Sequence, residues 1–356
     1  MSANQMTFAQ FEMLGRLQED NVLLKLNQLI NWEVFRPLLK GLYQREMTHA
    51  GGQIPHDPLM MFKATLLGQW HSLSDPKLED ALRVRIDFIL FCGMDLLTDM
   101  PDETTLCRFR NRLTNKGKLP LLLAEINRQL QAHNLMVKRS EGAVLDATLI
   151  TSAARPRQEI TLEVDGEGQA VTFEDGSQPG VKVTEKQSAD PDATWLKKGK
   201  KSYFGYRSYV TVDQEDGYVQ GVFTAPANES EVKHFESALN TVTLQAKRVL
   251  TDKGSSSAAN RAFLKRRWIK SGIMHKAARN KPLTERQKLA NKLISKKRYI
   301  VEQGFGTLKR LFGVGRASYF GTLKVNAQLF IKAMCFNLLK AANKIQLKSN
   351  LQEKTA

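Results

Sequence analysis

The sequence predicts an α/β protein in which an all-helical N-terminal region precedes a mixed sheet flanked by helices. Over residues 1–135 the apolar residues recur at three-to-four spacing, and no strand pattern occurs. From Gly142 onward, short apolar runs alternate with helical segments in the order strand, hairpin, helix, strand, helix, strand, helix. That order indicates a mixed central sheet covered by helices.

The N-terminal region is expected to form one helical domain over residues 1–135. Its helices are expected at residues 8–17, 21–44, 57–68, 77–91, 106–113 and 118–133. Pro37 is expected to break or kink the second helix, because proline lacks the backbone donor that a helix interior needs. The segment from Pro101 to Thr105 combines a turn with acidic residues, which is typical of a helix start.

The second region, residues 140–345, is expected to hold the sheet. Strands are expected at residues 143–150, 202–212, 218–225, 248–252 and 272–275, and helices at 229–239, 256–268, 283–311 and 323–345. The turn from Asp213 to Gly217 joins the second and third strands into a hairpin. Residues of about 152–195 are rich in Gly, Asp, Glu and Pro, which predicts a mobile insertion with one weak hairpin. Residues 346–356 are expected to form a loose tail.

The charge of the chain indicates a polyanionic partner. The formal net charge is +17, and the segment from Lys253 to Arg316 holds eighteen Lys or Arg residues against Glu285 and Glu302 alone. Such an excess favours DNA, RNA or an anionic membrane. The membrane is the weakest candidate, because no run approaches the roughly 20 apolar residues of a spanning helix. No signal peptide is recognisable at the N-terminus.

The three cysteines do not indicate a metal or a disulfide framework. Cys92, Cys107 and Cys335 lie far apart in apolar or helical surroundings, and the histidines are scattered. We therefore expect reduced core thiols in a cytosolic protein and no structural zinc site.

Three acidic residues stand out by their positions. Asp146 lies within the first apolar strand, Asp252 ends the fourth, and Glu302 lies on the long basic helix. If the first and fourth strands are neighbours, their acids meet at one edge of the sheet, and the helix can bring Glu302 over them. Such a cluster suits two Mg²⁺ ions, with Mn²⁺ able to substitute, because hard ions take oxygen ligands and cancel the repulsion between carboxylates.

Each acid also has a structural interpretation. Asp146 can be a buried acid paired with a structural arginine, and Asp252 can cap the helix that follows it. Glu302 can be an ordinary partner of Arg298 one turn away. Arg298 and Lys309 lie close to the Glu302 face of the helix, where phosphate contact and plain solvation are both open.

A second group of cations lies on the helix after Pro101. Arg108, Arg110, Asn111 and Arg112 can form a DNA-recognition helix, or an amphipathic helix that packs on its neighbours. The two interpretations have equal weight. Trp195 and Tyr203 can stack on an unpaired base, although a role in the core or in a flap is favoured.

The ordered set of motifs resembles a known family. The long helix reads Ser295, two residues, Arg298, three residues, Glu302, six residues, Lys309. The first strand carries Asp146 within Val144–Thr148, and the fourth strand ends in Asp252-Lys253-Gly254-Ser255. The chain resembles bacterial insertion-sequence transposases of the DDE type, whose last motif has Tyr, Arg, Glu and Lys at this spacing. Ser295 and Ser255 depart from the family, which often has tyrosine at those positions.

The resemblance, which spans nearly the whole chain, implies a fold and an activity. It implies an RNase H-like catalytic domain over residues 140–345, with Asp146, Asp252 and Glu302 as catalytic residues and ligands of two Mg²⁺ ions. It implies that water cuts the transposon ends and that the freed 3′ hydroxyls attack target DNA, with no covalent protein–DNA intermediate. Lys253, Arg298 and Lys309 are the expected phosphate contacts near the metals.

The resemblance also implies partners and a location. The expected partners are double-stranded terminal inverted repeats and target DNA, bound by a homodimer or larger assembly. Residues 1–135 are expected to serve DNA binding or dimerisation, and the protein is expected in the bacterial cytoplasm, associated with the nucleoid. Two alternatives remain: a metal-dependent nuclease of the same fold, which cleaves without joining, and a transposase-derived DNA-binding protein without catalysis.

Overall fold

The structure is a computed structural model that describes residues 12, 15, 17, 21–43, 54–95, 99–162, 181–186, 188–241 and 246–353. Most of the helix expected at residues 8–17 lies outside this described part, as does the whole segment 163–180. Within the described part, no helix is both long enough and apolar enough to cross a membrane.

The N-terminal region is helical throughout its described residues. Its elements are α2 (Val22–Leu29), η1 (Trp32–Phe35), α3 (Arg36–Leu39), α4 (Pro58–Trp70), α5 (Asp75–Val84), α6 (Ile86–Cys92), α7 (Glu103–Asn115) and α8 (Leu119–Ala132). The helix expected at 21–44 is interrupted before Pro37, where the Asn31 side chain caps η1 by accepting from the Glu33 backbone N–H. Pro37 instead lies in the first turn of α3, where its missing N–H costs nothing.

The helix expected at 77–91 is also two helices. The backbone of Arg85 is extended, with φ −89° and ψ 111°, so it ends α5 and starts α6. The apolar spacing continues across this break, which is why the sequence predicted one helix.

The main sheet has six strands. They are β1 (Ala143–Thr151), β4 (Thr194–Lys198), β5 (Lys201–Asp213), β6 (Val219–Pro226), β7 (Arg248–Thr251) and β8 (Lys270–Ile273). The order is β4-β5-β1-β7-β8, with β6 also paired to β5. The β5–β1 and β5–β6 pairs are antiparallel, whereas β1–β7 and β7–β8 are parallel. The expected neighbourhood of the first and fourth strands is therefore confirmed.

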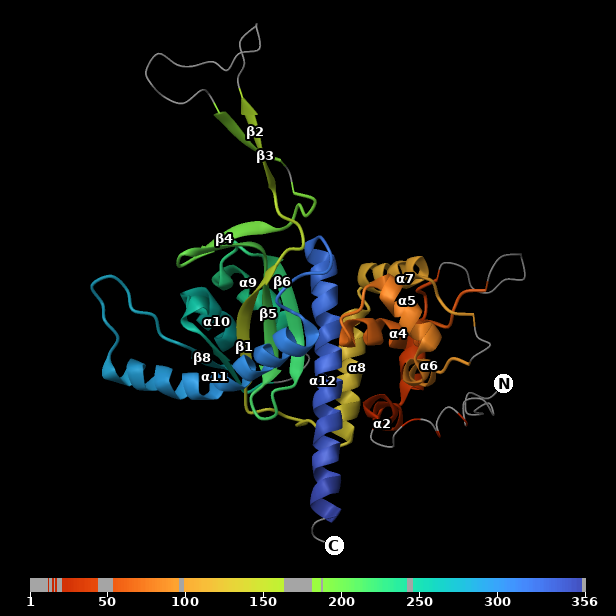
Figure 1. Cartoon of the computed structure of the whole chain (residues 1–356). Coiled ribbons are helices and arrows are strands. Elements are labelled where there is room, and N and C mark those ends of the chain that lie inside the picture. Colours follow the sequence, from red (N-terminus) through yellow and green to blue (C-terminus); the bar gives the residue numbers. More distant parts are fainter. Residues whose placement is uncertain are drawn as a thin grey trace, which may run out of the picture.

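Helices cover both faces of the sheet (Figure 1). On one face, α9 (Glu231–Asn240) and α10 (Ala258–Arg266) pack on alternate strand residues such as Leu145 and Val249. On the other face, α11 (Glu285–Phe312) and α12 (Thr322–Glu353) pack on the intervening residues, including Val144. The result is the mixed α/β architecture of the RNase H-like fold.

Helix α12 joins the sheet to the N-terminal helices (Figure 1). The buried Asn337 on α12 donates to Asn127 of α8 and to the Val219 carbonyl of β6, and it accepts from the Val219 N–H, at 2.7–2.8 Å. The apolar core is continuous across this junction. Helix α12 continues to Glu353, so residues 346–353, which were expected to be a loose tail, extend the helix instead.

The insertion between the first two core strands contains a separate hairpin. Strands β2 (Arg157–Leu162) and β3 (Val181–Lys186) pair with each other and project away from the main sheet (Figure 1). After them, β4 returns to the main sheet and pairs with the start of β5.

Candidate active site

Asp146 and Asp252 lie side by side because their strands are parallel neighbours. The register pairs Ala143 with Val249 and Val144 with Leu250, and each acid follows two residues after the second pair. Asp146 lies on the same sheet face as Val144, which is the face that α11 covers. The strand pairing therefore sets both carboxylates at one level of the sheet, beneath the long basic helix.

Asp146 is paired with Arg298 from α11. Arg298 Nη2 lies 2.9 Å from Asp146 Oδ2, and the Ala147 N–H donates to the other carboxylate oxygen. Burial raises the pKa of the Asp146 carboxyl, Arg298 opposes that shift, and the neighbouring Asp252 adds to it. A buried acid next to a second acid is stabilised by a cation, and in this structure the guanidinium is that cation.

Arg298, which was predicted to contact DNA phosphate, contacts other residues of the chain in this structure. Arg298 is only 9% exposed. Its Nη2 forms the ion pair with Asp146, and its Nη1 contacts the Met274 sulfur. The ion pair agrees with the structural interpretation of Asp146, in which this acid is buried and paired with an arginine. Arg298 therefore holds the carboxylate of Asp146 in place.

Asp252 caps the short helix that follows it, which was one of the two interpretations of this residue from the sequence. Its carboxylate accepts the Gly254 N–H at the start of η2 (Lys253–Ser255). Asp252 remains partly exposed and Lys253 beside it is exposed, so both can meet a ligand from solvent.

Glu302 lies on α11 one turn after Arg298, and its side chain is exposed. Among the described residues, no three acidic, histidine or cysteine side chains lie close enough to hold one metal ion together. The structure thus brings Asp146 and Asp252 together, whereas among the described residues Glu302 does not join them in a three-ligand group.

Glu231 is a carboxylate that the sequence did not single out. It is the first residue of α9, and a side chain built at Gly254 would collide with the carboxylate oxygens of both Glu231 and Asp252. Burial raises the pKa of Glu231, Arg207 opposes the shift, and Asp252 and Asp146 add to it. The signal for Glu231 in the sequence is weak, because an acid in the first turn of a helix is common for reasons of the helix dipole.

A cleft of about 580 Å³ opens beside these acids. Its lining side chains include the cations Lys197, Lys198, Arg207 and Lys309, together with Glu231. Lys197 and Lys198 come from β4, and Lys309 comes from α11, so segments far apart in the sequence supply the cations of the lining. Lys309 is exposed in this cleft, in a position to meet a phosphate.

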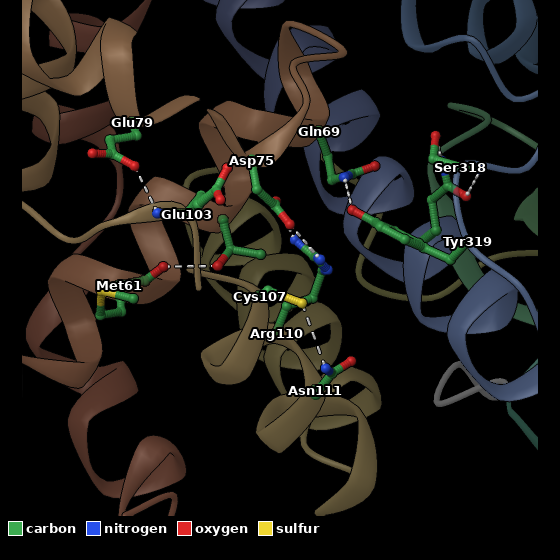
Figure 2. Close-up of polar contacts among 12 residues, drawn as sticks. Met61, Gln69, Asp75, Glu79, Glu103, Cys107, Arg110, Asn111, Ser318 and Tyr319 are labelled. Atoms are coloured by element: carbon green, nitrogen blue, oxygen red, sulfur yellow. Dashed lines mark hydrogen bonds and ion pairs between the residues drawn. The ribbon is translucent and has the colours of Figure 1, made fainter. Parts of the chain in front are cut away.

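The predicted recognition helix is α7, and its cations have different environments. Arg110 is 9% exposed and forms two hydrogen bonds of 2.6 and 2.8 Å with Asp75, so its guanidinium, which was predicted to contact DNA, is engaged within the protein (Figure 2). Arg112 is exposed and stacks over the Tyr43 ring, and the half-buried Asn111 donates to the Cys107 sulfur. Arg108 is exposed.

The fold and the paired acids define a class of nucleic-acid phosphoryl transferases with carboxylate sites. Comparison with known families makes the assignment specific. The transposase DDE domain family matches residues 139–338, and a second family, described as a transposase domain of the DUF772 type, matches residues 11–112. The chain belongs to the DDE transposases, enzymes that act on DNA.

Individual relatives agree with the family. The transposase of insertion sequence element IS1106 from Neisseria meningitidis serogroup B is 44% identical over 238 residues, covering 67% of this chain and 78% of the relative. Among solved structures, the piggyBac transposase synaptic complex with hairpin DNA superposes with a TM-score of 0.43 at 8% identity, covering 97% of this chain and 77% of the other. The Mos1 mariner paired end complex with Mn gives 0.20 at 11% identity, covering 88% and 85%.

Proposed function

We propose that this protein cuts the ends of an insertion sequence and joins their 3′ hydroxyls to target DNA. The observation that carries the proposal is the pairing of Asp146 and Asp252 on neighbouring parallel strands inside a matched DDE domain. In the first step, a water oxygen bonds to phosphorus, and the bond from phosphorus to the 3′ oxygen breaks, which leaves a 3′ hydroxyl. In the second, that hydroxyl attacks a target phosphodiester and displaces the target 3′ oxygen.

The donor set fits hard divalent ions. DDE transposases use divalent metal, and we assign Mg²⁺ here, with Mn²⁺ as a substitute. Asp146 and Asp252 would hold the ions, and Glu302 would complete the set from α11. The charge of Asp252 adds to the raised pKa of Asp146, and the charges of Asp252 and Asp146 add to that of Glu231; a nearby cation relieves such repulsion between carboxylates. When bound, two such ions activate the attacking hydroxyl or water and stabilise the leaving oxygen.

The residues around the acids position the DNA strand and the acids themselves. Lys309 in the cleft and Lys253 beside Asp252 hold backbone phosphates. Arg298 fixes the Asp146 carboxylate through its ion pair. The carboxylate of Glu231 is held by Arg207 at 3.2 Å, at the edge of the same cleft.

The expected partners are the double-stranded ends of the element and the target DNA. Two ends are joined in step, so we propose that a homodimer or larger assembly acts on paired ends. The cations of α7 that remain accessible, Arg108 and Arg112, are candidates for DNA contact by residues 1–135, which we propose as the DNA-binding or dimerisation domain.

The test is a cleavage and joining assay on labelled element ends with Mg²⁺ or Mn²⁺. Wild type is compared with Glu302→Gln. We expect the variant to bind DNA and to give neither cleaved nor joined product. Equal product from both proteins would refute the role of Glu302.

The nuclease alternative is separated by a second substrate. Pre-cleaved ends with free 3′ hydroxyls are incubated with plasmid, so that joining is measured without prior cleavage. A transposase gives joined product, and a nuclease gives none. The non-catalytic alternative requires that Asp146→Asn leave every measured activity unchanged.

A further inference from the structure

A second cavity lies far from the acids in the chain, between the N-terminal helices and the start of α12. Its volume is about 660 Å³, and none of its lining residues lines the cleft beside Asp146. It is bounded by the end of α4, the start of α5, one side of α7 and the loop between α11 and α12 (Figure 2).

Lys332 of α12 is a buried cation that lines this cavity without a partner. The residue is 4% exposed, and no hydrogen bond or ion pair is formed by it within the described part of the chain. A side chain built at Gly313 would lie 3.7 Å from Ser72 Oγ and 4.0 Å from Lys332 Nζ, so hydroxyl and ammonium approach the same point. Burial lowers the pKa of Lys332 to about 8.

A buried ammonium without a counter-charge costs free energy, because its hydration is lost and no attraction replaces it. It is rarely kept in a core unless an anion meets it. Lys332 is therefore complementary to an anionic ligand that enters the cavity.

The remaining polar lining favours the same charge. The N-terminus of the ten-residue helix α5 opens on the cavity, and its N-cap residue Ser74 makes no side-chain capping hydrogen bond. The free end of a helix attracts anions. Arg108 adds an exposed guanidinium to the lining.

The acidic side chains of the lining do not neutralise Lys332. Asp75 is fully engaged, because Arg110 donates to both of its oxygens (Figure 2). Arg110 in turn lies over the Tyr319 ring at 4.4 Å, and the Tyr319 hydroxyl accepts from Gln69. Glu103 is exposed and forms no ion pair with Lys332.

We propose that this cavity binds a backbone phosphate of duplex DNA, with Lys332 Nζ and the N-terminus of α5 as its ligands and Arg108 at the mouth. DNA is the favoured source of the phosphate because the chain carries a net charge of +17. The proposal rests on the proposed function, since it assumes a DNA substrate. It adds an anchor outside the catalytic cleft, built where the N-terminal helices meet α12.

The experiment measures binding of a fluorescent duplex carrying an element end, by anisotropy in EDTA over a range of salt concentrations. The test variant is Lys332→Met. The control is Lys63→Met, which removes the other deeply buried lysine; Lys63 is 7% exposed, lies over the rings of Trp32 and Phe91, and does not line the cavity. Thermal melts verify that both variants fold.

Loss of one phosphate contact should weaken Lys332→Met binding about tenfold and lower the salt slope by about one. Lys63→Met should bind as wild type does. Arg108→Gln, an exposed change, provides a second variant should Lys332→Met fail to fold, with weakened binding again expected. Wild-type affinity and slope in Lys332→Met, or in Arg108→Gln where only that variant folds, would overturn the proposal.

The same samples are then supplied with Mg²⁺ and scored for cleavage and joining. Weakened binding by Lys332→Met together with no product from wild type would leave the phosphate site in place and reject the transposase reaction. Full product from wild type together with unchanged binding by Lys332→Met would support the transposase reaction and reject the phosphate site.

Discussion

The ion pair between Arg298 and Asp146 makes a quantitative prediction about stability. The two side chains are 11% and 19% exposed, and the contact is 2.9 Å. Removing one partner of a buried pair costs about 3–5 kcal/mol, because the other charge stays buried. Here both groups retain some solvent, so we expect Arg298→Met to lower the free energy of unfolding by roughly 2–3 kcal/mol.

The structure also predicts which part of that loss belongs to the pair. Asp146→Asn removes the buried charge and its repulsion with Asp252, so Arg298→Met should cost roughly 1 kcal/mol in that background. The coupling energy of the double-mutant cycle is then about 1–2 kcal/mol.

The assay is urea unfolding of the four proteins at pH 7 in EDTA, followed by circular dichroism. Wild type, the two single variants and the double variant are measured together. The dependence of the unfolding free energy on urea is compared among them, because a change in midpoint at an unchanged slope is a change in stability. The same loss from Arg298→Met in both backgrounds would refute the claim that Arg298 acts through Asp146.

Three further predictions follow from other residues. Glu231→Gln should raise the Mg²⁺ concentration needed for half-maximal joining several-fold, while Glu229→Gln should leave it unchanged; an equal requirement in all three proteins would remove Glu231 from the site. Gly254→Ala should sharply reduce joining, since its methyl group would displace the carboxylates of Glu231 and Asp252; wild-type product from this variant in the joining assay would be inconsistent with the described geometry. Lys332→Met should be more stable than wild type at pH 7, by at most roughly 3 kcal/mol, because the pKa of Lys332 falls from 10.5 to about 8 on folding. Between those values the unfolded chain binds the proton and the folded chain does not, so wild-type stability rises with pH and the gap should close above pH 8 in thermal melts; a gap that widens there would contradict the burial of a charged Lys332.

Local patterns in the sequence were sufficient for the elements and for two of the acids. Alternating and apolar runs predicted the five core strands, and the basic stretch predicted α11 within two residues at each end. Asp146 and Asp252 could be found because a carboxylate within or just after a buried strand is costly unless its charge is used.

Other features depended on contacts that no local pattern contains. The apolar spacing continues across Arg85 as in one helix, whereas the backbone there is extended and separates α5 from α6. Arg110 on α7 pairs with Asp75 on α5, a contact between helices that the spacing along α7 does not contain. Likewise, Arg298 matches a phosphate-binding motif by spacing, yet the fold buries it against Asp146.

The sequence by itself determined the class of protein, the order of its strands and helices, and the strongly basic surface of its last catalytic helix. Only the tertiary structure decided which cations remain exposed, that Glu231 joins the acids, and that Lys332 has no ion-pair partner among the residues that the structure describes. The reason is physical: periodicity and composition follow from neighbours along the chain, whereas burial, ion pairing and pKa shifts depend on groups that folding brings together from distant positions.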